Sequence, residues 1–425
     1  MPSPLHRCLL ASLLVLCTLH AVPTAASEEE LGLPLEELRA FAEVLDRIRS
    51  AYVDPVDDRT LLESAIRGML SQLDPHSSYL DEEAFRNLQE STRGEFGGIG
   101  LEVDRENGWV RVVAPMDDTP AQRAGLEPGD LIVRIDDRPV REMSLDDAVN
   151  AMRGEVGTEV RLDVRREGAA ELIEMSLIRA RIEVPSISSR VIEPGFGYVR
   201  IAQFQSRTGD DLLIALAELE EQSPSGLHGL ILDLRNNPGG VLQASVAVAD
   251  AFLETGRIVY TRGRLASAQV SYSASGHDRL PDVPLVVLIN EGSASAAEIV
   301  AGALQDHRRA LVLGTPSFGK GSVQTILPLS DERGIKLTTA LYYTPEGRSI
   351  QAHGIVPDIH VDPGASERRN SARVRRESDL PRHLRGNETP PDEVSAPVTD
   401  DRQVMEALNI LRGMHLLSRR DSGQE

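Results

Sequence analysis

The chain has 425 residues, 41% of them hydrophobic and 26% charged, a length sufficient for two or three domains with a sizeable buried core. Its formal net charge of −21 at pH 7 disfavours nucleic acid and anionic lipid surfaces as partners. Both cysteines, Cys8 and Cys17, lie near the N-terminus, so the rest of the chain has no thiol for a disulfide, a zinc site or nucleophilic attack.

The first residues have the pattern of an export signal. Arg7 precedes an apolar run from Cys8 to Val22, and the small residues at 24–26 stand before an acidic stretch. The apolar run is shorter than the ~20 residues that a membrane span needs, and no later run is long enough. We therefore expect residues 1–26 to be removed as a signal peptide, and the mature protein to be exported without a transmembrane segment.

Residues 27–93 are predicted to be a small helical region, because apolar residues recur at helical spacing over 35–49 and over 60–73. The pattern then changes to short strands separated by turn signals, with one helix over 144–152. These strands are expected at 110–113, 130–135 and 160–164. We therefore expect a compact β-rich module over residues 94–182.

Strands alternate with helices over residues 183–364, which predicts an α/β core. Near-continuous apolar strands suit a buried parallel or mixed sheet, and they are expected at 197–201, 230–234, 285–289 and 310–313. Helices are expected near 210–220 and 296–307. Residues 365–400 are poor in large aliphatic side chains and rich in charge and proline, so we expect a disordered linker there. A short amphipathic helix is predicted within 401–425.

Ser295 stands between a predicted strand and a predicted helix, in the run Gly-Ser-Ala-Ser-Ala-Ala-Glu at 292–298. Together with Glu298 it matches a capping box, which is the commoner role for this spacing. A serine at a helix N-terminus also has free backbone N–H groups and the positive end of the helix dipole beside it, which suit a developing oxyanion. Ser295 is therefore a candidate nucleophile, and from the residues alone Ser293 is another.

A serine nucleophile needs a base. His277, His307 and His353 occur in the region, but none lies in a local catalytic motif. Lys320 follows the next apolar strand, and burial can lower the pKa of a lysine far enough for it to act as a base. The chain has only two lysines, Lys320 and Lys336, against 43 arginines, which do not give up their proton. This bias favours Lys320.

Three further features complete the pattern. Gln324 can share a face with Lys320 and orient its amine, although a structural amide fits the spacing equally well. The turn Asn-Asn-Pro-Gly-Gly at 236–240 leaves a buried strand, and its glycines allow backbone N–H groups to approach a substrate closely. The glycine-rich run at 97–101 opens a strand and can capture a peptide carboxylate.

Together these segments resemble the carboxyl-terminal processing proteases, also called tail-specific proteases, which are secreted or periplasmic S41 serine peptidases with a PDZ domain. The resemblance covers nearly the whole mature chain and rests on five motifs in order, at 94–101, 124–130, 236–240, 292–298 and 318–324. It implies a ClpP/crotonase-like α/β peptidase core over 183–364, with an inserted PDZ domain over 94–182 and the helical region before it.

The resemblance also implies a role for each candidate residue. Ser295 would attack the scissile carbonyl, Lys320 would be the general base, and Gln324 would position Lys320. The oxyanion hole would consist of the backbone N–H groups of Ala296 and of Gly239 or Gly240. The PDZ residues Gly98, Ile99, Gly100 and Leu101 would bind a free C-terminus, and Arg153 is hypothesised to couple that binding to assembly of the site. This mechanism needs no metal and no cofactor.

By the same resemblance, the expected partners are protein substrates of the bacterial periplasm, bound through their C-termini. A lipoprotein adaptor with helical repeats and a homo-oligomer are further expectations. Two other functions stay open at this point. One is a PDZ scaffold whose peptidase core is inactive without a partner. The other, a crotonase-like acyl-CoA enzyme, fits the core but not the export signal or the PDZ module.

Overall fold

The computed structural model describes residues 34–169, 171–330, 332–363, 376–384 and 401–421. The expected signal peptide, 1–26, lies outside the described residues. The chain divides into one unit that ends at Ser64 and a second that begins at Ala65. The first unit contains α1 (Leu35–Ala51) and the start of α2 (Asp58–Ser71), which confirms the two helices predicted from apolar spacing. No residue of α1 is buried, and its apolar side chains Leu38, Phe41 and Val44 are exposed.

The second unit begins with the rest of α2 and includes the β-rich module. Its entering strand β2 (Glu95–Gly98) pairs antiparallel with its leaving strand β9 (Ala180–Glu183). Between them a sheet runs in the order β3 (Leu101–Glu106), β4 (Trp109–Pro115), β5 (Leu131–Ile135), β7 (Glu159–Arg165) and β8 (Ile173–Ile178), with β6 (Arg138–Pro139) on β5. The remaining elements are α4 (Pro120–Arg123), η1 (Val140–Glu142) and α5 (Leu145–Met152).

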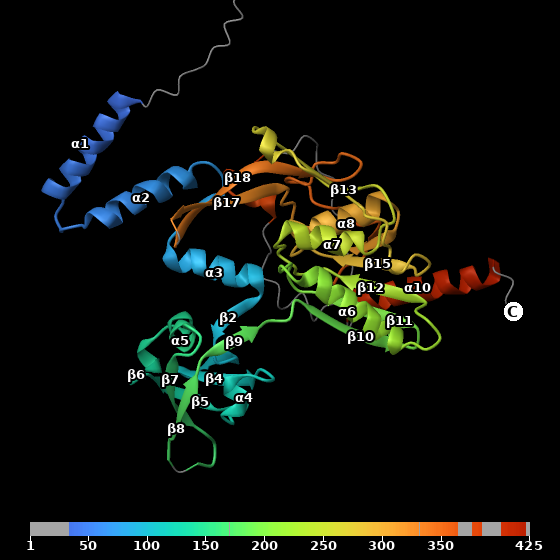
Figure 1. The fold of residues 1–425 in the computed structure, drawn as a ribbon, viewed down its shortest axis with the longest axis horizontal. Helices are drawn as coiled ribbons and strands as arrows, with labels where there is room; N and C mark the ends of the chain where they lie inside the picture. Colours follow the sequence, from blue (N-terminus) through green and yellow to red (C-terminus); the bar gives the residue numbers. More distant parts are fainter. Residues whose placement is uncertain (1–33, 170, 331, 364–375, 385–400, 422–425) are drawn as a thin grey trace, which may run out of the picture. The chain divides into compact units, whose positions relative to one another are not determined.

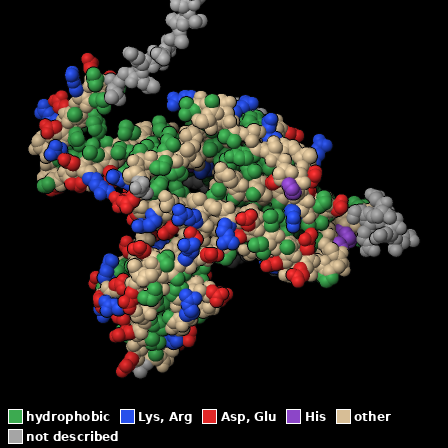
Figure 2. Space-filling model, viewed as in Figure 1, with side chains coloured by type: hydrophobic (Ala, Val, Ile, Leu, Met, Phe, Trp, Pro, Cys, Tyr) green, Lys and Arg blue, Asp and Glu red, His purple; other side chains and the backbone are tan. Residues whose placement is uncertain are grey.

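The core of this module follows from the alternation of its strands. Val160, Leu162 and Val164 alternate along β7 and are fully buried, together with Val110 and Ile132 of neighbouring strands. Ser144, the first residue of the predicted helix, is the N-cap of α5 and forms a capping box with Asp147. Figure 2 shows acidic and basic side chains interleaved over the visible surface of the module.

The α/β core is built on a six-stranded sheet. Its order is β10 (Ile187–Glu193), β11 (Phe196–Ile201), β12 (Gly229–Asp233), β15 (Leu285–Ile289), β16 (Ala310–Gly314) and β19 (Ile359–His360). In this sheet β11, β12, β15, β16 and β19 run parallel to one another, and β10 pairs antiparallel with β11. The three strands that precede the candidate residues, β12, β15 and β16, therefore end at the same edge of the sheet.

Helices cover both faces of this sheet (Figure 1), which explains why every residue of β12 and β15 is buried. Leu230 and Leu232 pack toward α6 (Thr208–Glu221), α7 (Leu242–Asp250) and α8 (Ala296–Asp306). Ile231 packs on the opposite face against Leu408 of α10 (Arg402–Asp421). The predicted C-terminal helix therefore packs against the core.

A second sheet was not predicted from the sequence. It runs β1 (Ser78–Leu80), β18 (Arg333–Tyr343), β13 (Arg257–Gly263) and β14 (Ser271–Ser273), with β17 (Ser322–Ser330) on β18. Its strands are mostly half-buried and rich in polar residues, so they lack a clear apolar alternation. The sequence analysis also missed α3 (Glu82–Arg93), which is capped by Asp81, and η2 (Ala266–Ala268).

The expected disordered linker over 365–400 is wrong for one piece of that stretch. Residues 376–384 form a described segment with a 3-10 turn, η3 (Glu377–Asp379), and Glu377 is 0% exposed. Composition did not reveal this piece, because its burial depends on one charged side chain with partners far away in the sequence. The other residues of 365–400 lie outside the described residues.

Candidate active site

Ser295 lies at the junction of β15 and α8, as the sequence predicted. Its backbone has φ 54° and ψ −110°, whereas an ordinary N-cap residue has extended backbone. A non-glycine residue held at positive φ costs about 1–3 kcal/mol and is often found at functional sites. The side chain is largely buried, with 8% of the residue exposed. The turn therefore presents the hydroxyl of Ser295 beside the first N–H groups of α8.

The carboxylate of Glu298 joins the serine turn to the lysine turn. Its Oε2 accepts hydrogen bonds from the backbone N–H of Ser295, at 2.7 Å, and from that of Lys320, at 2.9 Å. Its Oε1 accepts from Ser317 Oγ, at 2.5 Å, and from the Gly319 N–H, at 2.8 Å. Burial raises the pKa of Glu298 to about 7, although all four hydrogen bonds lower it. One side chain thus places Ser295 and Lys320 in the same site.

Lys320 lies in the turn between β16 and β17, and its ammonium is in an environment that favours the neutral amine. Burial lowers its pKa, and the positive charge of Lys336 lowers it further. Three carboxylates act in the opposite direction, those of Glu377, Glu298 and Asp74. The turn also bonds directly to the serine turn, because the N–H of Phe318 donates to the carbonyl of Ser293 at 3.0 Å.

The glycine turn after β12 lies against Ser295. A Cβ on Gly239 would stand 2.9 Å from Ser295 Cβ and 3.1 Å from the Ala296 nitrogen, so only glycine fits there. The N–H of Ala294 donates to the carbonyl of Asn237 at 2.9 Å and ties the two turns together. The Gly239 N–H donates to Asn237 Oδ1 at 2.9 Å, and the carbonyl of Gly239 accepts from the Phe204 N–H at 2.9 Å.

A buried ion-pair network fixes the base of this turn, and the sequence analysis did not identify it. Arg235 donates to Asp233 from Nη2, at 2.7 Å, and to Asp401 from both terminal nitrogens, at 2.8 and 2.9 Å. Tyr198 donates to the same Asp233 at 2.7 Å. The start of α10 is therefore tied to the residue that precedes Asn236. The Asp-Leu-Arg run after the strand was visible in the sequence, but its partner 166 residues away was not.

Gln324 lies in β17, close to the lysine turn. Its Nε2 donates to Ser322 Oγ at 2.9 Å and to Thr338 Oγ1 at 3.3 Å. Thr338 in turn donates to Asp74 at 3.1 Å. These bonds place the amide in a polar chain that leads to Asp74.

The other candidates have structural partners. The Ser293 hydroxyl is fully buried and donates to the Leu234 carbonyl at 2.7 Å. His277 lies 2.9 Å from Ser275 Oγ, His307 lies 2.7 Å from the Arg257 carbonyl, and His353 Nδ1 lies 2.8 Å from the Gln351 carbonyl.

Tyr342 was also missed by the sequence analysis. Burial raises the pKa of its phenol to about 12, although a hydrogen bond with the Ser295 side chain acts in the opposite direction. A buried phenol therefore lies beside the candidate nucleophile.

Similarity to known proteins agrees with this geometry. Peptidase family S41 matches residues 195–361, a PDZ domain matches 111–166, and the activating protease CtpB N-terminal domain matches 18–84. The carboxy-terminal-processing protease of Bartonella bacilliformis is 46% identical over 386 residues, which cover 89% of each chain. The chain belongs to peptidase family S41. The predicted serine-type peptidase with a PDZ domain is confirmed, as is the fold class of an S41 α/β core with a PDZ domain and N-terminal helices.

Other relatives in the S41 family extend the comparison. The carboxyl-terminal-processing protease of Synechocystis is 41% identical over 323 residues, 74% of each chain. Carboxy-terminal processing protease CtpA of Bacillus subtilis is 34% identical over 319 residues, 75% of this chain and 67% of that one. The solved photosystem II D1 C-terminal processing protease is 34% identical, covers 77% of this chain and 93% of its own, and has a TM-score of 0.45.

The PDZ domain presents its predicted peptide-binding loop at the edge of its sheet. Gly98 ends β2, Leu101 begins β3, and β3 is an end strand of the five-stranded order. Ile99 is buried, and its carbonyl accepts from the Ala121 N–H at 2.9 Å. Gly100 has φ 77°, and a Cβ there would stand 2.4 Å from the Thr119 side chain. The loop is therefore fixed from behind by residues 119–121.

Arg153 ends α5 of the PDZ domain and contacts two other elements. Its guanidinium carbon lies 4.5 Å from the centroid of the Phe96 ring in β2, and its Nη1 lies 3.9 Å from Glu90 of α3. Asn150, one turn earlier, donates to Glu83 of α3 at 3.1 Å. The end of α5 therefore contacts both the connecting strand β2 and α3, the helix that precedes the PDZ domain in the chain.

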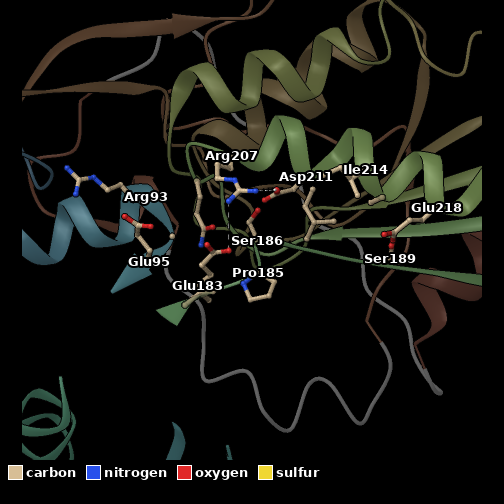
Figure 3. Close-up of a pocket in the computed structure, with 15 residues that line it drawn as sticks. Arg93, Glu95, Glu183, Pro185, Ser186, Ser189, Arg207, Asp211, Ile214 and Glu218 are labelled. Atoms are coloured by element: carbon tan, nitrogen blue, oxygen red, sulfur yellow. Dashed lines mark ion pairs between the residues drawn. The ribbon is translucent and has the colours of Figure 1, made fainter. Parts of the chain in front are cut away.

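The pocket in Figure 3 lies where the connecting strands of the PDZ domain reach the S41 core. Its lining comes from the end of α3, from β2 and β9 with the residues that follow β9, and from α6. Arg207 pairs there with Asp211 at 3.8 Å and with Glu183 at 3.9 Å. None of the candidate catalytic residues lines it.

Within the described ranges of the chain, no helix has the length and apolar character that crossing a membrane requires.

Proposed function

We propose that this chain is an exported serine endopeptidase that uses a Ser/Lys dyad to process or degrade envelope proteins from near their C-termini. Ser295 is the nucleophile and Lys320 the general base. The oxyanion donors are the backbone N–H groups of Ala296 and of Gly239 or Gly240. Gly240 is favoured, because the Gly239 N–H already has a partner in Asn237.

The single observation that carries the proposal is the shared carboxylate oxygen of Glu298. The N–H groups of Ser295 and Lys320 both donate to Oε2, at 2.7 and 2.9 Å. The two backbone nitrogens therefore both lie within hydrogen-bond distance of the same oxygen atom. The serine is strained and lies at a helix N-terminus, and the lysine is buried. The buried bond of Ser293 to the Leu234 carbonyl favours Ser295 over that neighbour as the nucleophile.

In this mechanism the neutral amine of Lys320 accepts the proton of Ser295 as Oγ attacks the scissile carbonyl carbon. The carbonyl oxygen becomes an oxyanion that the backbone N–H groups stabilise. Collapse of the intermediate breaks the C–N bond, and the Lys320 ammonium gives its proton to the departing amine. A water molecule then attacks the acyl ester with Lys320 again as the base, which releases the acid and restores Ser295. Gln324 is assigned to orient the amine.

The remaining assignments rest on the PDZ domain and on the resemblance described above. The loop Gly98–Leu101 would bind substrate C-termini by strand addition to β3. The expected location is the bacterial periplasm, and a lipoprotein adaptor with helical repeats and a homo-oligomer stay part of the proposal. The alternative function is a PDZ scaffold whose core is inactive without a partner.

The test is cleavage of an unfolded protein substrate by residues 27–425. Ser295→Ala should abolish cleavage, and Lys320→Arg should reduce it about 10²- to 10⁴-fold, because a guanidinium cannot serve as a base. Lys336→Arg is the matched control, since it makes the same change at the other lysine and should keep wild-type activity. Cleavage retained by Lys320→Arg would assign the base to another residue. If wild type is silent, cleavage after addition of periplasmic extract would indicate a gated enzyme, and continued silence would favour the scaffold.

A further inference from the structure

The segment 376–384 brings a second buried carboxylate to the lysine turn. Glu377 is 0% exposed, and its carboxylate lies 2.7 and 2.9 Å from His76 Nε2. Because an ionised carboxylate can only accept, the imidazole donates from Nε2. Gln351, also 0% exposed, donates from Nε2 to Glu377 Oε1 at 3.0 Å. The Ser295/Lys320 mechanism described above assigns no task to any of these side chains.

Glu377 and Gln351 bond to opposite ends of the turn that carries Lys320. The backbone N–H of Glu377 donates to the Phe318 carbonyl at 3.1 Å. On the other side, Gln351 Oε1 accepts from the Gly321 N–H at 2.9 Å. Since the Gln351 amide also donates to Glu377, the two ends of the turn are linked through one side-chain hydrogen bond. Glu298 holds the backbone between these two points.

Charges from four elements face Lys320. Glu377 of η3, Glu298 of α8 and Asp74, in the loop before β1, are acidic, whereas Lys336 of β18 is basic. Hydrogen bonds from Ser77, His76 and Thr338 outweigh the burial of Asp74 and hold its pKa below the usual range. Asp74 is thus occupied by neutral donors, and Glu377 has His76 as its own close ionisable partner.

We propose that Glu377 is a positioning residue for Lys320, acting with Gln351 as a clamp on the two ends of the lysine turn. The negative charge of its carboxylate also stabilises the protonated form of the Lys320 amine. This inference rests on the proposed function only where it concerns catalysis. Its structural part, that Glu377 and Gln351 hold the two ends of the lysine turn, stands without any assumption about the reaction.

The decisive measurement is NMR titration of the full-length chain labelled with ¹³C-lysine. Only two lysines exist, so two sets of ε-methylene signals are expected, and Lys320→Arg assigns them. In Glu377→Gln, Lys320 should titrate at lower pH than in wild type, because the ammonium loses a negative neighbour. Glu377→Asp keeps the charge and should titrate close to wild type. Asp379→Asn removes an exposed carboxylate from the same turn but keeps an oxygen that can accept from the Arg376 N–H, so it should also leave the titration of Lys320 unchanged.

An activity profile complements the titration. In Glu377→Gln, the rise of kcat/KM with pH should move toward lower pH together with the NMR titration of Lys320. Gln351→Leu removes the hydrogen bonds of the amide to Gly321, Glu377 and the Leu384 carbonyl but keeps the Glu377 charge, so kcat should fall about tenfold with KM retained, because the amine is less well placed. If the titration of Lys320 moves in Glu377→Gln but the pH dependence of kcat/KM does not move with it, Lys320 is not the base, whereas the effect of Glu377 on Lys320 is supported.

An unchanged Lys320 titration in folded Glu377→Gln would overturn the inference. So would a Glu377→Asp variant that titrates like Glu377→Gln, because the charge would then not be the cause. Thermal unfolding reports whether each variant is folded. If Glu377→Gln does not fold, Gln351→Leu decides the question, and a wild-type kcat in that variant would overturn the clamp.

Discussion

Glu298 is the residue on which the arrangement of the site depends most directly. Its carboxylate accepts from Ser295, Ser317, Gly319 and Lys320, so the ionised form satisfies four donors at once. Replacement by glutamine places an NH₂ group where one carboxylate oxygen accepted, so the N–H groups that donated to that oxygen lose their acceptor. The serine and lysine turns should then separate, while the fold around them persists through its apolar core.

Glu298→Gln should therefore lower kcat about 100-fold, of the order seen when one preorganised hydrogen bond at a reacting centre is lost. Glu291→Gln, in the same turn but bonded to Thr315, is the matched control and should stay near wild type. The expected result is measured as steady-state cleavage of an unfolded substrate. Equal kcat in the two variants would show that the hydrogen bonds accepted by the Glu298 carboxylate are not needed for activity.

The raised pKa of Glu298 also predicts how stability depends on pH. The ordinary value of 4.5 applies to the unfolded chain, and the folded value is about 7, so unfolding releases a proton between these values. The contribution of this group to the free energy of unfolding therefore falls as pH rises through that window. The same Glu298→Gln variant should lose that part of the pH dependence when denaturant midpoints are compared.

At the scale of elements, the sequence predicts well where local patterning is strong. The strands β12 and β15 are continuous apolar runs, and α8 begins at Ala296 as expected. The half-buried strands β17 and β18 carry no such pattern. Arg235 and Glu377 could not be recognised, since their partners Asp401 and His76 lie 166 and 301 residues away. Local sequence cannot specify such contacts, because they follow only from the completed fold.

The end of α5 is the element where coupling between the PDZ domain and the core can be tested. Arg153 contacts Phe96 of β2 and lies near Glu90 of α3, so its removal should loosen the link between the peptide loop and the helix that precedes the PDZ domain. Arg153→Ala should keep basal cleavage within about twofold, because exposed ion pairs contribute little to stability. Stimulation by a C-terminal peptide should be lost. Stimulation equal to wild type would remove Arg153 from the coupling.

At the scale of the whole molecule, three turns at one edge of the central sheet bring together residues far apart in the sequence. The turns after β12, β15 and β16 carry Gly239, Ser295 and Lys320, and hydrogen bonds between the turns hold them in register. The segment 376–384 adds Glu377 to the same site from beyond the sheet. Burial lowers the pKa of Lys320, which is the direction that its proposed role as a base requires.

The Ser295/Lys320 dyad is tested by covalent labelling of the whole protein with a fluorophosphonate probe, read by mass spectrometry across a pH series. We expect one modified peptide, the one containing Ser295, with a labelling rate that rises with pH as Lys320 loses its proton. Lys320→Arg should label far more slowly, and Ser295→Ala not at all. Labelling at another serine, or the same rate and pH dependence in Lys320→Arg, would contradict the Ser295/Lys320 dyad.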